Sequence, residues 1–419
     1  MTRRAVNFYL RTITRAYVRY SCPVRFYSPE ATMTSRLAAI GAVAAIISFL
    51  SAADFGASAA GALIFASLTT AGIVSLCWVF YPAYVARGGG DGATVSEEQL
   101  CPPSDIAQTP AAAPMLSIVI PAYNEEERLP KMLDATLAHL NEKFQEVTTR
   151  CQDALEARCE KGHTRKRASN SIEIIVVSDG STDATEEVVR SYAGRVTQVN
   201  RSNCLRLVKL DRNSGKGAAV KEGMARSRGM LCLMVDADGA TEIGSGLRKV
   251  LDQMKDLLGS QKGIRREDAG PYDPICAVFG SRAHMEEEST ASRSVVRTFL
   301  MRAFHFFVRC LCSSNVRDTQ CGFKLFTHKA ASVLSHNLHL RRWAFDTELV
   351  VMMERKGWPI AEVAVRWHEV EGSKIDESKL ALVLNSLGML RDMLCVRLCY
   401  TLRLWTLSMP SVLLAEKNS

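Results

Sequence analysis

The feature that most constrains the fold is a series of short apolar runs, each of which ends in polar or acidic residues. The runs lie at Leu116–Ile120, Ile172–Val177, Leu205–Leu210, Leu231–Val235 and Ile275–Phe279. Between residues 129 and 140, apolar residues recur at the spacing of a helix that buries one face. Strands that alternate with helices favour a parallel sheet covered by helices. Residues 115–375 therefore predict an α/β domain.

Polar side chains follow four of these predicted strands. The four segments are Pro121–Glu126, Ser178–Asp183, Asp211–Gly217 and Asp236–Asp238. Ligands of open α/β sheets bind beyond the carboxyl ends of the strands. Helix capping by Ser181 or Asp183 would explain one such residue, but not acids at all four ends. The sequence therefore predicts a binding site along this edge.

The pair Asp236 and Asp238 is the candidate metal site. Two carboxylates at a strand end can hold Mg²⁺ or Mn²⁺ against a diphosphate, although an isolated Asp-x-Asp is often only a turn. Lys216, flanked by glycines, opens the next predicted helix and stands at a suitable place for phosphate. Leu210 and Gly217 break the Walker A pattern, so this segment is not a P-loop.

Two apolar, uncharged runs, 37–53 and 59–81, precede the α/β domain. The second can span a bilayer core of about 30 Å, and the first is short for that purpose. We expect a membrane anchor of one or two transmembrane helices within 37–85, after an Arg-rich segment at 1–36. A pair of buried core helices is the alternative, which the lack of a polar face disfavours.

The remaining segments have less specific patterns. Residues 86–114 are rich in Gly, Pro and Ala and predict a linker. Residues 141–170 are charged and irregular, which predicts a surface insertion. Residues 294–312 and 376–419 are apolar with interspersed arginines, which predicts amphipathic helices lying on a membrane, with ordinary amphipathic core helices as the alternative.

Composition excludes some classes of protein. The 419 residues are 47% hydrophobic and 23% charged, as in a folded chain. The net charge is +8, but no basic stripe with aromatic or helix-turn-helix context accompanies it, so we expect no nucleic-acid partner. The 13 cysteines are scattered, which fits a reducing compartment rather than a zinc site.

Eight signatures carry a resemblance to a known family. They are S-I-V-I-P-A-Y-N-E-E-E-R-L-P (117–130), V-V-S-D-G-S-T-D (176–183), N-S-G-K-G-A-A-V (213–220), V-D-A-D-G-A-T (235–241), G-S-R-A-H (280–284), R-D-T-Q-C-G-F-K-L-F (317–326), R-W-A-F-D-T-E-L (342–349) and E-V-E-G-S-K (369–374). Together they resemble the inverting family-two glycosyltransferases of the GT-A fold, a Rossmann-like, mostly parallel sheet flanked by helices. Within that family they are most similar to the dolichyl-phosphate β-glucosyltransferases, over about residues 115–407.

The resemblance implies roles for individual residues. The residues implied to bind the nucleotide sugar are Pro121, Tyr123, Glu125, Asp179, Lys216, Asp236, Gln320, Trp343 and Glu348. The implied ligands of Mg²⁺ or Mn²⁺ are Asp236 and Asp238. The implied catalytic residues are Asp238, Asp318, Asp346 and Arg282, and the acceptor phosphate would be held by Arg282, Arg297 and Arg302. Ser178 departs from the family, which often has an acid there, so the exact uracil contact stays open.

The implied reaction is transfer of glucose from UDP-glucose to dolichyl phosphate with inversion. The resemblance places it at the endoplasmic reticulum membrane, with the catalytic domain facing the cytosol and the lipid bilayer as a partner. Two alternatives stay open. One is mannosyl transfer from GDP-mannose, and the other is a non-catalytic membrane protein that binds a nucleotide sugar.

Overall fold

The computed structural model describes residues 71–72, 74–83, 86, 93–100, 113–157, 169–261, 274–282, 307–309, 311–312, 315–370 and 379–410. The chain divides into two units, residues 1–81 and 82–419. In the first unit, residues 71–72 and 74–81 are helical. The second unit contains the sheet and the candidate site.

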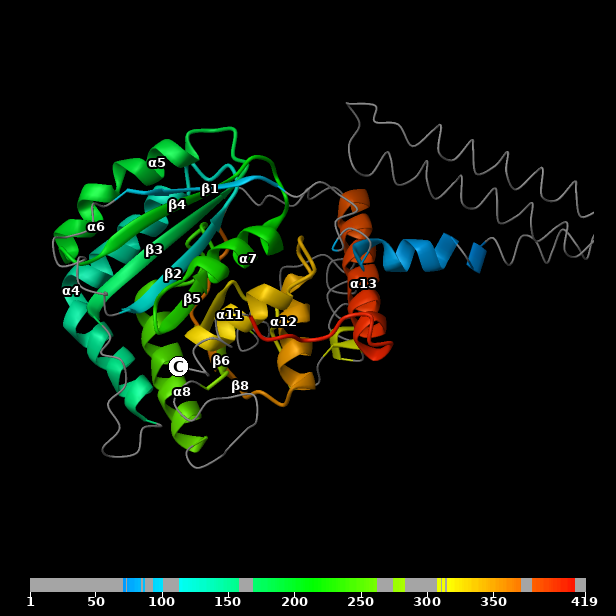
Figure 1. The fold of residues 1–419 in the computed structure, drawn as a ribbon. Coiled ribbons are helices and arrows are strands. Elements are labelled where there is room, and N and C mark those ends of the chain that lie inside the picture. Colours follow the sequence, from blue (N-terminus) through cyan, green and yellow to red (C-terminus); the bar gives the residue numbers. More distant parts are fainter. Residues whose placement is uncertain are drawn as a thin grey trace, which may run out of the picture. The chain divides into compact units, whose positions relative to one another are not determined.

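An eight-stranded sheet in the order β1-β4-β3-β2-β5-β7-β6-β8 forms the centre of the second unit (Figure 1). The strands are β1 (Val95–Gln99), β2 (Pro114–Ala122), β3 (Ser169–Asp179), β4 (Cys204–Leu210), β5 (Leu231–Val235), β6 (Ala277–Ser281), β7 (Phe323–Thr327) and β8 (Ile360–Ala364). Strands β4, β3, β2 and β5 run parallel to one another, as do β6 and β8. Strand β1 pairs antiparallel with β4, and β7 pairs antiparallel with both β5 and β6. The sheet is therefore mixed and mostly parallel, and the predicted α/β class is confirmed.

Helices cover both faces of this sheet (Figure 1). The helices are α4 (Leu129–Glu156), α5 (Thr185–Ser191), α6 (Ala193–Val199), α7 (Lys216–Arg226), α8 (Ile243–Ser260), α11 (His328–Asn337), α12 (Phe345–Arg355) and α13 (Lys379–Thr401). Helices α4, α5, α6 and α8 pack on one face, and α7 and α11 pack on the other. Helix α12 packs against α13.

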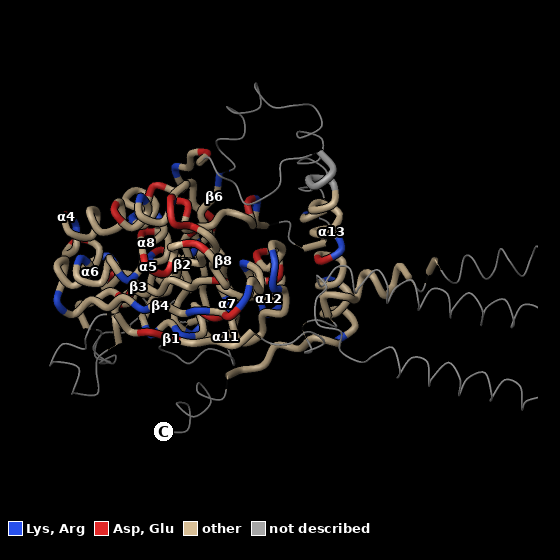
Figure 2. Tube along the Cα trace, turned by 90° about the horizontal axis from the view of Figure 1, so that it is seen from above, with Lys and Arg blue, Asp and Glu red and all other residues tan. Residues whose placement is uncertain are grey.

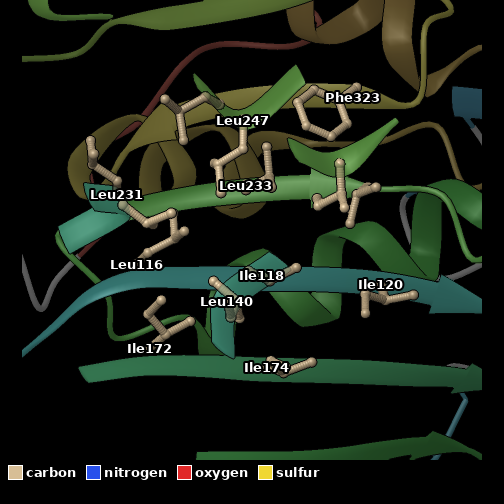
Figure 3. Close-up of a cluster of buried hydrophobic side chains, with 14 of the residues drawn as sticks. Leu116, Ile118, Ile120, Leu140, Ile172, Ile174, Leu231, Leu233, Leu247 and Phe323 are labelled. Carbon is tan, nitrogen blue, oxygen red and sulfur yellow. The ribbon is translucent and has the colours of Figure 1, made fainter. Parts of the chain in front are cut away.

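The hydrophobic core lies between the sheet and α4 and α8. Leu116, Ile118 and Ile120 of β2 point into it, beside Leu140 of α4 and Leu247 of α8 (Figure 3). The intervening β2 residues are also buried, because α7 covers the other face. Strands buried on both faces have near-continuous apolar sequences, which is why these runs stood out in the sequence.

Helix α4 extends well beyond the region where its apolar spacing is obvious. It continues to Glu156 past a kink at Lys143, so the prediction of an irregular insertion is wrong for residues 141–156. The buried positions beyond the kink are Phe144, Val147, Thr148, Cys151, Ala154 and Leu155. These recur every three or four residues, but charged residues on the exposed face hid the pattern. The prediction is also wrong for residues 169–170, which begin β3, and residues 158–168 lie outside the described residues.

Strand β1 lies inside the segment that we predicted to be a linker. Val95–Gln99 pairs with Arg206–Leu210 at the edge of the sheet, so the linker prediction is wrong for these five residues. Glu97 pairs with Arg206 at 2.7 Å, and Glu98 with Arg190 at 3.3 Å. An edge strand held by backbone hydrogen bonds and ion pairs needs no apolar alternation, so no hydrophobic pattern marks β1.

Within the described ranges, no helix combines the length and the apolar character needed to cross a bilayer. The predicted run 37–53 lies wholly outside those ranges, and 59–81 lies largely outside them. Of the predicted amphipathic segments, residues 294–306 lie outside the described residues as well, and α13 belongs to the C-terminal one. Basic residues are interspersed among other residues along α13 (Figure 2).

Candidate functional site

Side chains tie the carboxyl end of β2 to that of β3. Asn124 takes a left-handed backbone conformation with φ of 53°, which asparagine tolerates better than most residues. Its side-chain oxygen accepts a hydrogen bond from the Thr182 N–H at 2.8 Å, and its own N–H donates to Ser181 Oγ at 3.1 Å. The Glu126 N–H donates to Asp183 Oδ2 at 3.1 Å. Acidic residues accordingly gather where β2 meets α5 (Figure 2).

Three residues implied to contact the nucleotide lie at the end of β2. Pro121 and Glu125 are buried, and Tyr123 is half-buried. The Glu125 carboxylate accepts a hydrogen bond from Arg128 Nε at 2.7 Å, and the Glu125 N–H donates to Thr185 Oγ1 at 2.7 Å. Glu125 therefore carries a partly neutralised charge in a fixed orientation.

Asp179 closes β3 and organises the turn before α7. Its carboxylate accepts hydrogen bonds from the N–H groups of Ser214 (2.7 Å) and Gly215 (2.8 Å). Burial raises the pKa of Asp179, and these two hydrogen bonds oppose that rise. The neighbouring Ser178 is buried, and its hydroxyl donates to Glu186 at 3.3 Å. The departure from the family at Ser178 is thus accommodated inside the fold.

Lys216, the first residue of α7, lies among carboxylates. Its ammonium is 2.6 Å from Asp236 Oδ1 and 5.7 Å from the centre of the Trp343 ring, which is 40% exposed. Burial by itself would lower the pKa of Lys216, but Asp236, Asp346 and Asp238 together raise it above its ordinary value. The ammonium therefore stays charged at neutral pH.

Asp236, at the end of β5, lies in close contact with Gly322 and Lys216. Its N–H donates to the Gly322 carbonyl at 3.0 Å, and a methyl group at Gly322 would collide with the Asp236 carboxylate. Asp236 Oδ1 is buried and lies 2.6 Å from the Lys216 ammonium, and no other donor among the described residues reaches it. This oxygen therefore relies on a single cationic neighbour.

This oxygen suits a hard divalent cation, which prefers carboxylate ligands. Asp238 is half-buried, and its Oδ1 accepts one hydrogen bond, from the Ala240 N–H at 3.0 Å. No group of three or more His, Cys, Asp or Glu side chains within the described ranges could hold a metal. Two carboxylates supply only part of the coordination of a divalent cation, so a cation at Asp236 and Asp238 would take further oxygens from a ligand such as a diphosphate.

Arg282 and Asp318 form a two-pronged pair beside this site. Arg282 Nε and Nη2 donate to the two Asp318 oxygens at 2.8 and 2.9 Å, and the Arg282 N–H adds a third bond at 2.9 Å. Burial would raise the pKa of Asp318, but its bonds with Arg282 lower it below its ordinary value. Glu362 of β8 accepts from the Asp318 N–H at 2.8 Å, and Trp367 lies 5.5 Å from the guanidinium.

Lys324 and Asp346 form a second, deeper pair. The Lys324 ammonium, completely buried on β7, lies 2.6 Å from Asp346 Oδ1 in the first turn of α12. Burial raises the pKa of Asp346, and Lys324 and Lys216 oppose that rise. Asp346 is thus a buried acid with a fixed cationic neighbour.

Two further implied sugar contacts lie nearby. The Gln320 N–H donates to Asp318 Oδ1 at 3.2 Å, so Gln320 adjoins the first pair. The Glu348 carboxylate is completely buried and accepts from the N–H groups of His339 (3.1 Å) and Leu340 (2.7 Å). Glu348 therefore acts on the loop before α12. Arg297 and Arg302, assigned to the acceptor phosphate, lie outside the described residues.

The structure brings the predicted acids and cations together around the end of β5, and it adds residues that the sequence analysis missed. Lys324 interrupts an otherwise apolar strand, which signals a buried cation in need of a partner. Glu362 gave no such signal, because β8 is short and only partly buried.

Comparison with known proteins identifies the family. The glycosyl transferase family 2 model matches residues 117–258. The dolichyl-phosphate beta-glucosyltransferase of Dictyostelium discoideum is 40% identical over 291 residues, 69% of this chain and 76% of that protein. Its counterpart in Homo sapiens is 41% identical over 293 residues, 70% of this chain and 78% of that protein.

Among solved structures, glucosyl-3-phosphoglycerate synthase from Mycobacterium tuberculosis, in complex with UDP, aligns with a TM-score of 0.37 at 16% identity. The alignment covers 70% of this chain and 81% of that one. The mixed, mostly parallel sheet is GT-A-like, in agreement with the resemblance seen in the sequence. The identities and coverages of the two curated relatives decide the assignment. The chain therefore belongs to glycosyltransferase family 2 and, within it, to the dolichyl-phosphate β-glucosyltransferases.

Proposed function

We propose that the protein transfers glucose from UDP-glucose to dolichyl phosphate and yields dolichyl β-D-glucosyl phosphate. Membership of the family makes it a glycosyltransferase. The observation that carries the proposal is the convergence of Lys216, Asp236 and Asp238 beside the pairs Arg282–Asp318 and Lys324–Asp346. Lys216, Asp236 and Asp238 suit a nucleoside diphosphate. The two pairs beside them suit an anionic acceptor.

On the donor side, Asp236 and Asp238 would hold Mg²⁺ or Mn²⁺, which neutralises the charge of the diphosphate when bound. Lys216 would add a second positive charge next to the diphosphate, since its ammonium lies beside Asp236. Pro121, Tyr123, Glu125 and Asp179 would surround the uridine, and Trp343 and Gln320 would contact the glucose. Glu348 would act on the donor site through the loop that it holds.

On the acceptor side, a phosphate oxygen would attack the anomeric carbon as the bond to UDP breaks on the opposite face, which inverts the configuration. A phosphate monoester has a second pKa of about 6, so the oxygen needs positioning more than deprotonation. Asp318 uses Nε and Nη2 of Arg282, so we assign Arg282 Nη1 to the acceptor phosphate, together with Arg297 and Arg302. Asp346 and Asp318 would orient the sugar and the attacking oxygen.

We also propose a location at the endoplasmic reticulum membrane with the catalytic domain in the cytosol. A hairpin of the apolar runs 37–53 and 59–81 would place the Arg-rich segment 1–36 on the cytosolic side, as the positive-inside tendency favours. An N-terminal tag in sealed microsomes tests this topology. Protease should digest the tag and the catalytic domain alike, whereas a protected tag beside an accessible catalytic domain would exclude the hairpin.

The proposed reaction is tested with the full chain in detergent, dolichyl phosphate, and labelled UDP-glucose, GDP-mannose and other nucleotide sugars in parallel. Labelled lipid should form with UDP-glucose and Mg²⁺ or Mn²⁺, and chelation with EDTA should stop it. Labelling from GDP-mannose alone would point to the mannosyl reaction. Binding of UDP-glucose without lipid product or release of UDP would indicate the non-catalytic alternative.

A further inference from the structure

We infer that the C-terminal segment 399–408 is a positioning element of the donor site, and that Glu348 transmits its docking to the loop 338–343 and to Lys216. The segment comprises the last three residues of helix α13 and the chain that follows them. The inference rests on the proposed function only where it names UDP-glucose as the donor. Its basis is a continuous series of contacts.

Glu348 is the junction of this series. On one side, its Oε2 accepts from the N–H groups of His339 and Leu340 at 3.1 and 2.7 Å. On the other, its Oε1 accepts from the Tyr400 hydroxyl at 3.2 Å, and it lies 2.8 Å from His339 Nδ1. Burial and the charge of Glu348 raise the pKa of Tyr400, so its hydroxyl remains a donor. A single buried carboxylate thus joins α13 to the loop before α12.

The chain after α13 folds back onto this junction, as the red segment of Figure 1 shows. Arg403 takes a left-handed conformation with φ of 58°, which costs free energy in a residue other than glycine and therefore needs support from its surroundings. Two residues later, Trp405 is buried and stacks on the His339 ring, with ring centres 3.9 Å apart and planes 4° apart. The turn at Arg403 therefore places Trp405 against the loop 338–343, which Glu348 also contacts.

Two more contacts fix the segment. The Asn337 side chain, at the end of α11, accepts from the Ser408 N–H at 2.9 Å and donates to the Ser408 carbonyl at 2.8 Å. Arg355 Nη2 donates to the Tyr400 carbonyl at 2.8 Å. The segment is therefore attached at several points to the two helices that flank the loop.

The loop in turn lies against the start of α7. The Arg341 carbonyl accepts from the Ala218 N–H at 3.0 Å, and the Leu338 carbonyl accepts from the Lys221 ammonium at 2.8 Å. Any side chain at Gly217 would collide with the loop backbone at Leu340, so the two segments are in close contact. A shift of the loop would therefore move Lys216, the residue that pairs with Asp236.

The test uses Tyr400→Phe and Glu348→Gln in the full chain, with Tyr192→Phe as a matched control. Tyr192 is also buried and donates its hydroxyl to Asp134 at 2.8 Å, but it belongs to the turn between α5 and α6 and has no place in the donor site. Both Tyr→Phe changes remove one hydroxyl that donates to a carboxylate, and because the Asp134 partner is exposed, Tyr192→Phe should lower stability no more than Tyr400→Phe does. We measure melting temperature, kcat, the KM values for both substrates, and the Kd for UDP by calorimetry.

Tyr400→Phe should raise the Kd for UDP and the KM for UDP-glucose by about three- to tenfold, the equivalent of one lost hydrogen bond. We expect kcat and the KM for dolichyl phosphate to stay within about twofold, because the contacts of the segment lead to the loop beside Lys216 on the donor side. Glu348→Gln should have the larger effect, because a carboxamide keeps only one acceptor oxygen for several donors. Tyr192→Phe should leave all kinetic values unchanged.

Hydrogen–deuterium exchange supplies a second, ligand-free readout. Amides of residues 338–344 and 216–220 should exchange faster in Tyr400→Phe than in the parent protein, and at parent rates in Tyr192→Phe. Unchanged exchange there, or an unchanged Kd for UDP beside a lowered melting temperature, would show that the segment is merely structural and overturn the inference. If the parent protein fails to bind UDP, the proposed donor is wrong, and the exchange rates still decide the positioning role.

Discussion

The buried carboxylates around the end of β5 differ in the donors that each one faces. Asp318 accepts from Nε and Nη2 of Arg282, Asp346 faces the buried Lys324, and one Asp236 oxygen is paired with Lys216. Burial raises the pKa of Asp346, whereas the pKa of Asp318 lies below its ordinary value because Arg282 outweighs the effect of burial. Aspartate can therefore serve within one site as a ligand for a cation, as the partner that orients an arginine, or as a buried acid.

Asp238→Asn should abolish transfer and leave the fold intact. The loss of a ligand carboxylate leaves the charge of the departing diphosphate uncompensated, which costs about 3–4 kcal/mol or roughly 10²–10³ in rate. Asp252→Asn on the exposed face of α8 is the control, since that carboxylate pairs only with Arg150 in the structure described. Initial rates measure the loss of transfer, and melting curves show whether the fold is intact. Near-parental turnover in Asp238→Asn with a normal melting curve would remove this residue from the site.

The pH dependence of the rate distinguishes a positioned acceptor from a general base. Burial raises the pKa of Asp346, so this acid could titrate in the acidic limb of a pH–rate profile if it removed a proton during transfer. We expect the limb to come from the acceptor phosphate instead, and to persist at the same pH in a residually active Asp346→Asn variant. A limb that disappears or moves by about one unit in that variant would make Asp346 the base.

The Arg282–Asp318 pair should make the free energy of unfolding depend on pH in the acidic range. The pKa of Asp318 is lower in the folded than in the unfolded chain, where it is about 3.9, so the pair stabilises the protein above that pH. Its contribution is lost as the pH falls through the folded pKa. Denaturant unfolding should show Asp318→Asn to be less stable by about 2 kcal/mol at pH 7, because the pair is partly exposed and weaker than a fully buried one. This deficit should shrink below pH 4, and a deficit that is independent of pH would exclude the ion pair as its cause.

At the scale of elements, the strands that the sequence predicted are those whose buried side chains form an apolar run, as in β2 to β6. Strand β7 is equally buried but was not predicted, because Lys324 interrupts its short run. Strand β1 lies at the edge with one covered side, and β8 is only half-buried, so neither has such a run. The second half of α4 was hard to predict for another reason. Its many exposed charged residues hide the helical spacing of its buried apolar residues.

Leu155→Ala tests whether this second half of α4 belongs to the core. Leu155 is 4% exposed, so its truncation should lower the free energy of unfolding by about 2–4 kcal/mol through the cavity that it leaves. Gln145→Ala, at an exposed position of the same helix, should change stability by less than about 0.5 kcal/mol. Equal effects of the two changes in urea titrations would mean that the helix does not pack there in solution.

At the scale of the whole molecule, the sequence predicted the residues of the candidate site better than it predicted the pairs that they form. Arg282 and Asp318 are 36 positions apart, and Lys324 and Asp346 are 22 apart. These pairs depend on β7 entering antiparallel between β5 and β6, which short-range patterns do not specify. The C-terminal segment is an extreme case, because Tyr400 meets Glu348 across 52 positions.

The close approach of β7 to β5 at Gly322 has a consequence for mutational tolerance. The carbonyl of Gly322 accepts from the Asp236 N–H, and a methyl group at residue 322 would occupy the space of the Asp236 carboxylate. Gly322→Ala should therefore reduce transfer by roughly 100-fold, the cost of displacing a catalytic group by about 1 Å. Gly259→Ala is the control, since a methyl group there meets nothing within 4 Å.

Rates, UDP affinity and melting temperature of the two variants would show whether the loss is confined to the site. Full activity in Gly322→Ala would mean that Asp236 can move without cost. With the expected loss, the damage from one added carbon would approach that expected from Asp238→Asn. Variant effects in such chains must then be judged by which atoms a new side chain displaces, as well as by which functional groups it deletes.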